Sequence, residues 1–135
     1  MAPAFLHLYF MKTLLVFALA LLLSAPAAFA QKTVHAVVSF TGPDTSLSIG
    51  KGQQFLVELW VPNRKDFSWQ MAAVPQACKF TSSRIGQAAT LPGQPEQQLW
   101  FFKATRAGTD TIRFLYRGPR DEAAVSTKTL YLQVQ

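Results

Sequence analysis

The chain has 135 residues, of which 50% are hydrophobic, so it is long enough for one domain with a substantial core. Lysine and arginine outnumber aspartate and glutamate by 13 to 7, which gives a formal net charge of +6. The cations stand singly along the chain, which argues against nucleic acid as a partner and favours acidic proteins or anionic envelope polymers.

Residues 1–30 predict a secretory signal peptide. Met11-Lys12-Thr13 is a short basic start, Leu14–Leu23 is an unbroken apolar run, and Ala28-Phe29-Ala30 fits a small-residue cleavage site. We therefore expect a signal-peptide helix, possible initiation at Met11, and an exported domain over residues 31–135 in the periplasm or outside the cell. An uncleaved membrane anchor is the alternative, but the run is short for a span of ~20 residues. After cleavage we expect no membrane contact.

Alternating apolar residues predict β-strands through most of the remaining chain. β-branched and aromatic residues recur with a period of two, which is typical of strands with one buried face. Seven or eight short strands separated by turn signals predict an all-β, two-sheet sandwich. The segments with this pattern are 34–40, 47–49, 55–61, 67–71, 99–102, 112–116 and 130–134.

Polar connections separate these strands. Pro62–Asp66, Gly86–Gln97 and Arg117–Glu122 are rich in proline, glycine or charge, and Arg106–Thr109 predicts a tight hairpin turn. Trp69 is expected in the core, whereas Trp60 and Trp100 fit either the core or a sheet surface.

The residues for a catalytic or metal site are missing. His35 is the only histidine after the leader and Cys78 the only cysteine of the chain, and both fit structural roles better than a nucleophile and its base. We expect Cys78 to be a small buried residue, with an intermolecular disulfide as the alternative. No spacing of histidine, cysteine and carboxylate residues predicts a metal site. The sequence therefore predicts no enzyme, no metal and no cofactor.

Four segments resemble the chagasin-like inhibitors of papain-type cysteine proteases. Leu47–Gly52 is similar to the opening strand and turn of that family, and Phe55–Leu59 to its second strand. Asn63–Trp69 stands where the family has an Asn-containing loop followed by an aromatic residue, a small residue and Trp. Phe102–Thr109 resembles the strand and Ala-Gly turn before its third loop. The resemblance implies an immunoglobulin-like sandwich of seven or eight strands that has no disulfide.

The resemblance also implies a site. Three loops at one end of the sandwich would plug the active-site cleft of a papain-like cysteine protease. The loop residues implied are Asn63, Arg64, Lys65, Asp66 and Phe67, then Pro92, Gly93, Gln94 and Pro95, then Arg117, Gly118, Pro119 and Arg120.

Two other functions stay open. Charged residues replace a small Pro-Thr-Thr-Gly stretch in the first loop, and the third loop has no aromatic residue. These differences fit a non-inhibitory immunoglobulin-like module whose basic loops bind an acidic protein or an envelope polymer. A subunit of an envelope assembly joined by edge strands is the third reading. We expect a monomer under the first two.

Overall fold

A computed structural model describes residues 33–62, 66–120 and 123–135 of the chain. Residues Thr33–Gln135 form one compact unit, and the predicted leader over residues 1–30 lies outside the described residues. Within the described part, no helix is long and apolar enough to cross a membrane.

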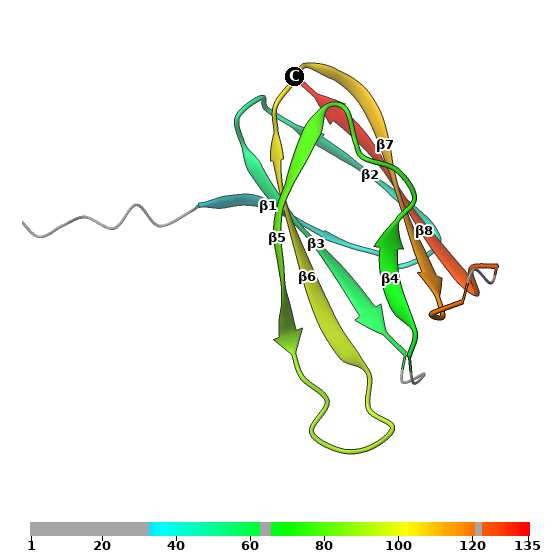
Figure 1. Ribbon diagram of the computed structural model, residues 1–135. Helices are drawn as coiled ribbons and strands as arrows, with labels where there is room; N and C mark the ends of the chain where they lie inside the picture. Colours follow the sequence, from blue (N-terminus) through cyan, green and yellow to red (C-terminus); the bar gives the residue numbers. More distant parts are fainter. Residues whose placement is uncertain (1–32, 63–65, 121–122) are drawn as a thin grey trace, which may run out of the picture. The chain divides into compact units, whose positions relative to one another are not determined.

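The predicted all-β fold is confirmed. Sheet A has the strand order β1-β3-β6-β5 and sheet B the order β2-β8-β7-β4, and Figure 1 shows the two sheets facing each other. The strands are β1 (Val34–Ser39), β2 (Asp44–Ile49), β3 (Gln54–Val61), β4 (Ser68–Met71), β5 (Cys78–Gln87), β6 (Glu96–Ala104), β7 (Gly108–Arg117) and β8 (Ser126–Val134).

The turn at Arg106–Thr109 does not close a hairpin, so that prediction was wrong. The strand before it, β6, pairs with β3 and β5, whereas β7 pairs with β4 and β8 in the other sheet. The turn therefore carries the chain from sheet A to sheet B. The residue before β5 stabilises the turn, because the N–H groups of Thr105 and Arg106 donate to the carbonyl of Ala77 at 2.9 and 3.2 Å.

Aromatic residues from both sheets form the core. Phe55 and Phe102 of sheet A stack with ring centroids 5.2 Å apart, and Phe102 meets Phe114 of sheet B edge-on at 6.2 Å. All three side chains are fully buried. Aromatic pairs of this kind add stability beyond the area that they bury, so they bind the two sheets into one body.

The tryptophans occupy three different environments. Trp69 is in the core as predicted, with 5% of its surface exposed. Trp100 is partly buried and packs edge-on against Phe114 at 5.6 Å. Trp60 lies on the surface of sheet A and is 46% exposed.

Candidate functional site

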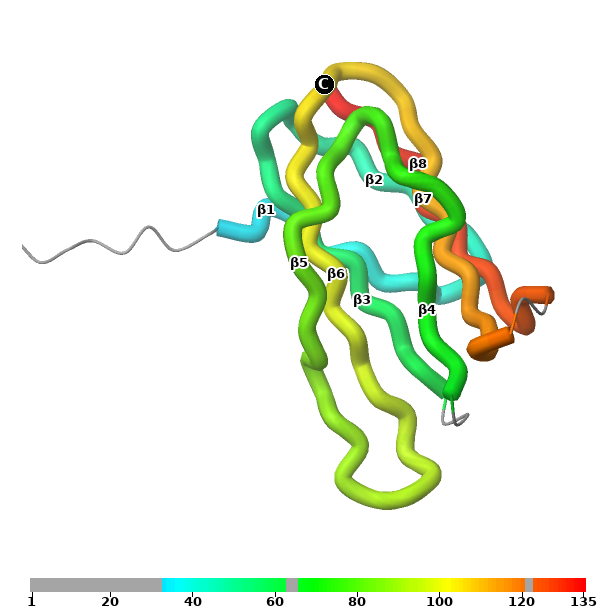
Figure 2. Tube along the Cα trace, viewed as in Figure 1, coloured from blue at the N-terminus to red at the C-terminus, as the bar shows by residue number. Residues whose placement is uncertain are grey.

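Three connections leave the sandwich at the same end. They are β3–β4, β5–β6 and β7–β8, and we call the end where they lie the loop end (Figures 1 and 2). The strand registers fix this arrangement, because each relevant strand either ends or begins there. The residue pairs nearest this end are Val61–Glu96 and Gln87–Gln97 in sheet A, and Ser68–Arg117 and Tyr116–Ser126 in sheet B.

Two hydrogen bonds tie the β3–β4 connection to the body of the sandwich. The hydroxyl of Tyr116 donates to the carbonyl of Pro62 at 2.6 Å, and Trp69 Nε1 donates to the carbonyl of Trp60 at 2.9 Å. Tyr116 and Trp69 are both buried, so their positions are fixed by the core. The first residue of the connection is therefore held from sheet B and the last residues of β3 from β4.

The predicted residues of the β3–β4 connection fall into different groups. Asn63, Arg64 and Lys65 lie outside the described residues. Asp66 is exposed and has a positive φ of 67°, a conformation that aspartate tolerates better than most residues. Phe67 is partly buried, and its ring centroid lies 5.7 Å from that of Tyr116. Its ring therefore packs against the core and not into solvent.

The β5–β6 connection is organised by the side chain of Gln94. Its Oε1 accepts hydrogen bonds from Thr90 Oγ1 at 2.8 Å, from Thr90 N at 3.2 Å and from Leu91 N at 3.3 Å. The N–H of Gln94 donates in turn to the carbonyl of Leu91 at 3.3 Å. Gly93, in between, has a φ of 94°, which favours glycine. Internal bonds thus define the turn, although all of its residues are exposed.

This connection presents its other side chains to solvent. Pro92, Gly93 and Pro95 are exposed. Leu91 is 62% exposed, although it was not among the residues predicted for this loop. A large aliphatic side chain inside a run rich in proline, glycine and glutamine was the signal that could have identified it.

The β7–β8 connection is partly built into the sandwich. Arg117 is the last residue of β7 and is half-buried, Gly118 is buried, and Pro119 and Arg120 are exposed. On the return side, the N–H of Val125 donates to the carbonyl of Tyr116 at 2.9 Å. Only Pro119 and Arg120 among the predicted residues of this loop are therefore free to reach a partner.

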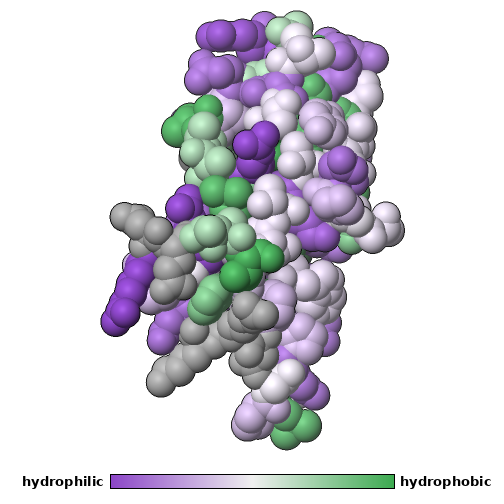
Figure 3. Space-filling model, turned by 90° about the vertical axis from the view of Figure 1, so that its right-hand side faces the viewer, coloured by the Kyte–Doolittle hydropathy of each residue, from purple (hydrophilic) through white to green (hydrophobic). Residues whose placement is uncertain are grey.

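The loop end carries exposed apolar side chains, each on a different connection or strand end. Leu91 and Val125 lie in two of the connections with 62% and 52% exposed surface, and Trp60 lies just before the third. Figure 3 shows one hydrophobic group at the lower edge of the molecule and larger ones at mid-height, among white and hydrophilic residues. Such side chains are typical of contact sites rather than of a purely solvated tip.

The described residues offer no catalytic site. Cys78 is buried, and burial, followed by the nearby charge of Asp110, raises its pKa from 9.0 to about 12. The thiol therefore carries its proton at neutral pH and is a poor nucleophile. His35 lies on β1 and accepts a hydrogen bond from Gln54 N at 3.2 Å. No group of three histidine, cysteine or carboxylate side chains in the described part could hold a metal ion.

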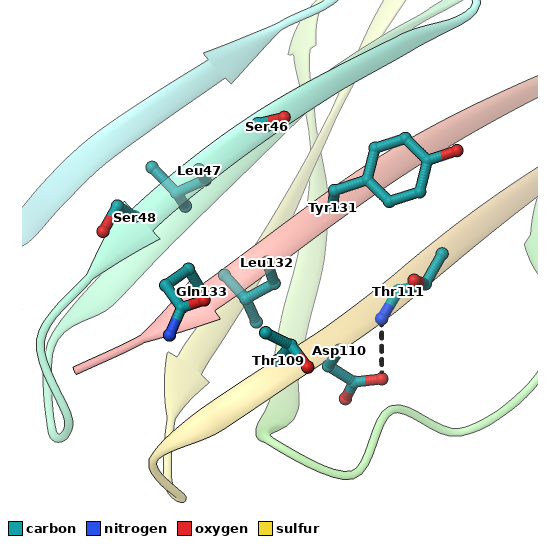
Figure 4. Close-up of a pocket in the computed structure, with 9 residues that line it drawn as sticks. All are labelled: Ser46, Leu47, Ser48, Thr109, Asp110, Thr111, Tyr131, Leu132 and Gln133. Carbon is teal, nitrogen blue, oxygen red and sulfur yellow. Dashed lines mark hydrogen bonds between the residues drawn. The ribbon is translucent and has the colours of Figure 1, made fainter.

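A shallow cavity of about 640 Å³ lies on sheet B, between β2, β8 and β7 (Figure 4). Its acidic group is Asp110, whose oxygens already accept hydrogen bonds from the N–H groups of Gln76, Ala77 and Thr111 at 2.6, 2.7 and 2.8 Å. Asp110 therefore holds the connection between β4 and β5. The cavity is lined by Ser46, Leu47, Ser48, Thr109, Asp110, Thr111, Tyr131, Leu132 and Gln133, none of which belongs to the loop end.

Comparison with known proteins gives a family and a set of solved structures. The sequence profile described as chagasin family peptidase inhibitor I42 matches residues 48–134. No curated protein sequence matches the chain significantly. The solution structure of amebosin superimposes with a TM-score of 0.61 at 21% identity, covering 76% of this chain and 100% of amebosin.

Two further structures carry descriptions of what they bind or inhibit. The cysteine protease inhibitor EhICP2 from Entamoeba histolytica superimposes with a TM-score of 0.62 at 16% identity, covering 76% of this chain and 100% of that one. PbICP-C, solved in complex with falcipain-2, gives a TM-score of 0.59 at 14% identity, with 74% and 99% covered. At these identities the likeness establishes the fold, and the sandwich predicted from the sequence is that of these proteins.

Proposed function

Because the chain belongs to the chagasin family of peptidase inhibitors, as its sequence resemblance predicted, we propose that it inhibits papain-like cysteine proteases by inserting its loop end into their active-site cleft. The family consists of inhibitors and not of enzymes. The observation that carries the proposal is the convergence of three tethered connections at one end of the sandwich.

The related structures support the choice of target class. EhICP2 is a cysteine protease inhibitor, and PbICP-C was solved bound to falcipain-2. The loop end also has a property that tight inhibitors need. Tyr116 and Trp69 hold Pro62 and the end of β3, and Gln94 holds the β5–β6 turn, so these described parts lose little conformational entropy when they dock.

We assign the apolar contacts to side chains that the resemblance did not include. Leu91 in the β5–β6 connection, with Val125 in the β7–β8 connection, takes the place of the aromatic anchor that the third loop lacks. Pro92, Gly93 and Pro95 follow Leu91 in the β5–β6 connection, Pro119 and Arg120 precede Val125 in the β7–β8 connection, and all five are exposed. Apolar anchors of this kind at the centre of an interface usually contribute most of the binding energy.

We also propose that the inhibitor is exported and acts as a monomer in the periplasm or outside the cell. The support is the order of basic, apolar and small residues in residues 1–30. A fold without a disulfide is compatible with either compartment, since the aromatic core holds the two sheets together.

An inhibition assay tests the function. The unit of residues 33–135, which contains both sheets and the core, is titrated against papain, and we expect reversible, stoichiometric inhibition. Leu91→Ser should weaken inhibition about tenfold or more, because it removes an apolar anchor. Val74→Ser is the matched control: Val74 is 80% exposed, in the β4–β5 connection away from the loop end, and its variant should inhibit like the wild type.

Full papain activity in the presence of micromolar protein would contradict the proposal for this enzyme class. Salt-sensitive binding to an acidic protein, without inhibition, would instead support a binding module that uses Arg120 and the basic residues of the first loop. Equal effects of Leu91→Ser and Val74→Ser would show that the tip of the β5–β6 connection is not an anchor.

A further inference from the structure

The outer side of sheet A carries cations and apolar side chains together. Strand alternation places them there. On β6, Phe102 and Ala104 are fully buried, so Phe101 and Lys103 point away from the core. On β3, Leu56 points away from the core because its neighbours Phe55 and Val57 are buried. We call this set the basic face. It consists of Lys79, Arg84 and Lys103 with Val37, Leu56 and Phe101.

The apolar residues of the basic face form one row across the sheet. Val37 of β1 pairs with Leu56 of β3, and Leu56 pairs with Phe101 of β6. Val37 is 57% exposed, and the other two are partly exposed. The guanidinium of Arg84 lies over the ring of Phe101, 5.5 Å from its centroid, so a cation sits directly on the apolar row.

The lysines form the next row. Lys79 of β5 and Lys103 of β6 are paired directly across the strands, and both are exposed. Like charges at directly opposite positions destabilise a sheet, and no ion pair links either lysine to another described residue. Neighbouring strands are only ~4.8 Å apart, so this pair concentrates positive charge on the outer surface of sheet A. Nothing in the core of the sandwich requires such a pair.

The acidic residue of this face does not neutralise the lysines. Glu58, on β3, accepts a hydrogen bond from Ser39 Oγ at 2.7 Å, and it is paired with Leu99 rather than with Lys103. The row that contains the lysines continues into the uncharged Gln54. A partner of this surface must therefore be anionic and must also accept apolar side chains.

We propose that the basic face docks on the surface of a bilayer that contains anionic phospholipids. A bilayer interface offers phosphate groups to the lysines and a boundary of acyl chains to Val37, Leu56 and Phe101. A second copy of the chain fits poorly, because it would bring lysines against lysines. The sequence predicted no membrane contact once the signal peptide is removed, and it showed cations spread singly along the chain, whereas the fold brings three of them onto one face.

Vesicle binding tests the proposal. Residues 33–135 are sedimented with vesicles of phosphatidylcholine that contain about one-third phosphatidylglycerol, and with vesicles of phosphatidylcholine alone. We expect binding to the anionic vesicles only, and its loss at about 0.5 M salt, where the charges are screened. Neutralising one lysine should lower the partition coefficient about fivefold, so Lys79→Gln/Lys103→Gln should lower it about 25-fold.

Lys51→Gln/Arg113→Gln is the matched control. It removes the same charge from the β2–β3 turn and from sheet B, and the partition coefficient should change less than about threefold. Val37→Ser tests the apolar row and should weaken binding several-fold without affecting the fold. Equal loss in both lysine and control pairs, or equal binding to neutral vesicles, would overturn the proposal. Binding to a soluble polyanion but not to vesicles would also overturn it and would identify an acidic polymer as the partner.

Discussion

Cys78 lies in the core between the sheets, beside the connection that Asp110 holds, and its thiol is protonated in the folded state. The pKa of this thiol is raised from 9.0 to about 12 by burial and by the charge of Asp110. Above pH 9 the unfolded chain therefore releases this proton while the folded chain keeps it. The contribution of Cys78 to stability is fully present below pH 9 and is lost as the pH rises toward 12.

We predict that the stability advantage of the wild type over Cys78→Ala shrinks between pH 9 and pH 12. Urea denaturation of both proteins at several pH values measures the free energy of unfolding, and the difference cancels the titration of other groups. Below pH 9 the difference should be constant. A difference that grew above pH 9 would mean that the fold lowers the pKa of the thiol, and rapid alkylation of the native thiol at neutral pH would mean that the thiol is accessible. That result would also revive the intermolecular disulfide, which the burial of Cys78 argues against.

At the scale of elements, the β5–β6 connection owes its shape to one side chain. Gln94→Ala removes three hydrogen bonds from Thr90 and Leu91 to Oε1. We expect inhibition of papain to weaken about tenfold through faster dissociation, because the loop must then be ordered on binding. The midpoint of urea denaturation should hardly change, since these residues are exposed. Inhibition kinetics and denaturation of the same variant measure the two effects.

Gln87→Ala is a suitable control for that variant. Gln87 is an exposed glutamine at the end of β5, just before the connection, and its side chain makes no hydrogen bond to a described residue. Its variant should inhibit like the wild type. If both variants weakened inhibition equally, the effect would belong to the hairpin as a whole and not to the bonds of Gln94.

The strands that bury one face were predictable from the sequence, and the others were not. Alternation identified β7, in which Ile112, Phe114 and Tyr116 are all buried. It missed β5, because most of its residues beyond Cys78 are exposed on both faces and two bulges shift its register. The Arg106–Thr109 turn was predicted as a hairpin because the sequence of a short turn is the same whether the two strands beside it pair with each other or lie in opposite sheets.

Part of the candidate site was also predictable from the sequence, and part was not. Family resemblance located the three connections, and the structure brings them to one end. Leu91 was not predicted because the exposure of its side chain depends on the turn that Gln94 stabilises. The side-chain hydrogen bonds of that turn cannot be read from a local sequence pattern. The pairing of Lys79 with Lys103 escaped notice because those residues are far apart in sequence and meet only through the β5–β6 register.

At the scale of the whole molecule, the loop end and the basic face are separate surfaces. The loop end consists of connections beyond the last strand pairs, whereas Lys79 and Lys103 lie where β5 begins and β6 ends. The two surfaces share no residue, and a rigid aromatic core lies between the two sheets. A domain held by the basic face would therefore keep its loops free for a protease.

We predict that the two activities can be removed independently. Lys79→Gln/Lys103→Gln should lose binding to anionic vesicles and still inhibit papain like the wild type, and Leu91→Ser should show the opposite pattern. Both variants change exposed side chains, so their thermal unfolding should match that of the wild type. If vesicles carrying bound domain failed to retain papain, the loops would be blocked on the membrane. If either variant lost both activities while remaining folded, a single surface would bind both partners. The assignment of inhibition to the loop end and of vesicle binding to the basic face would then be wrong.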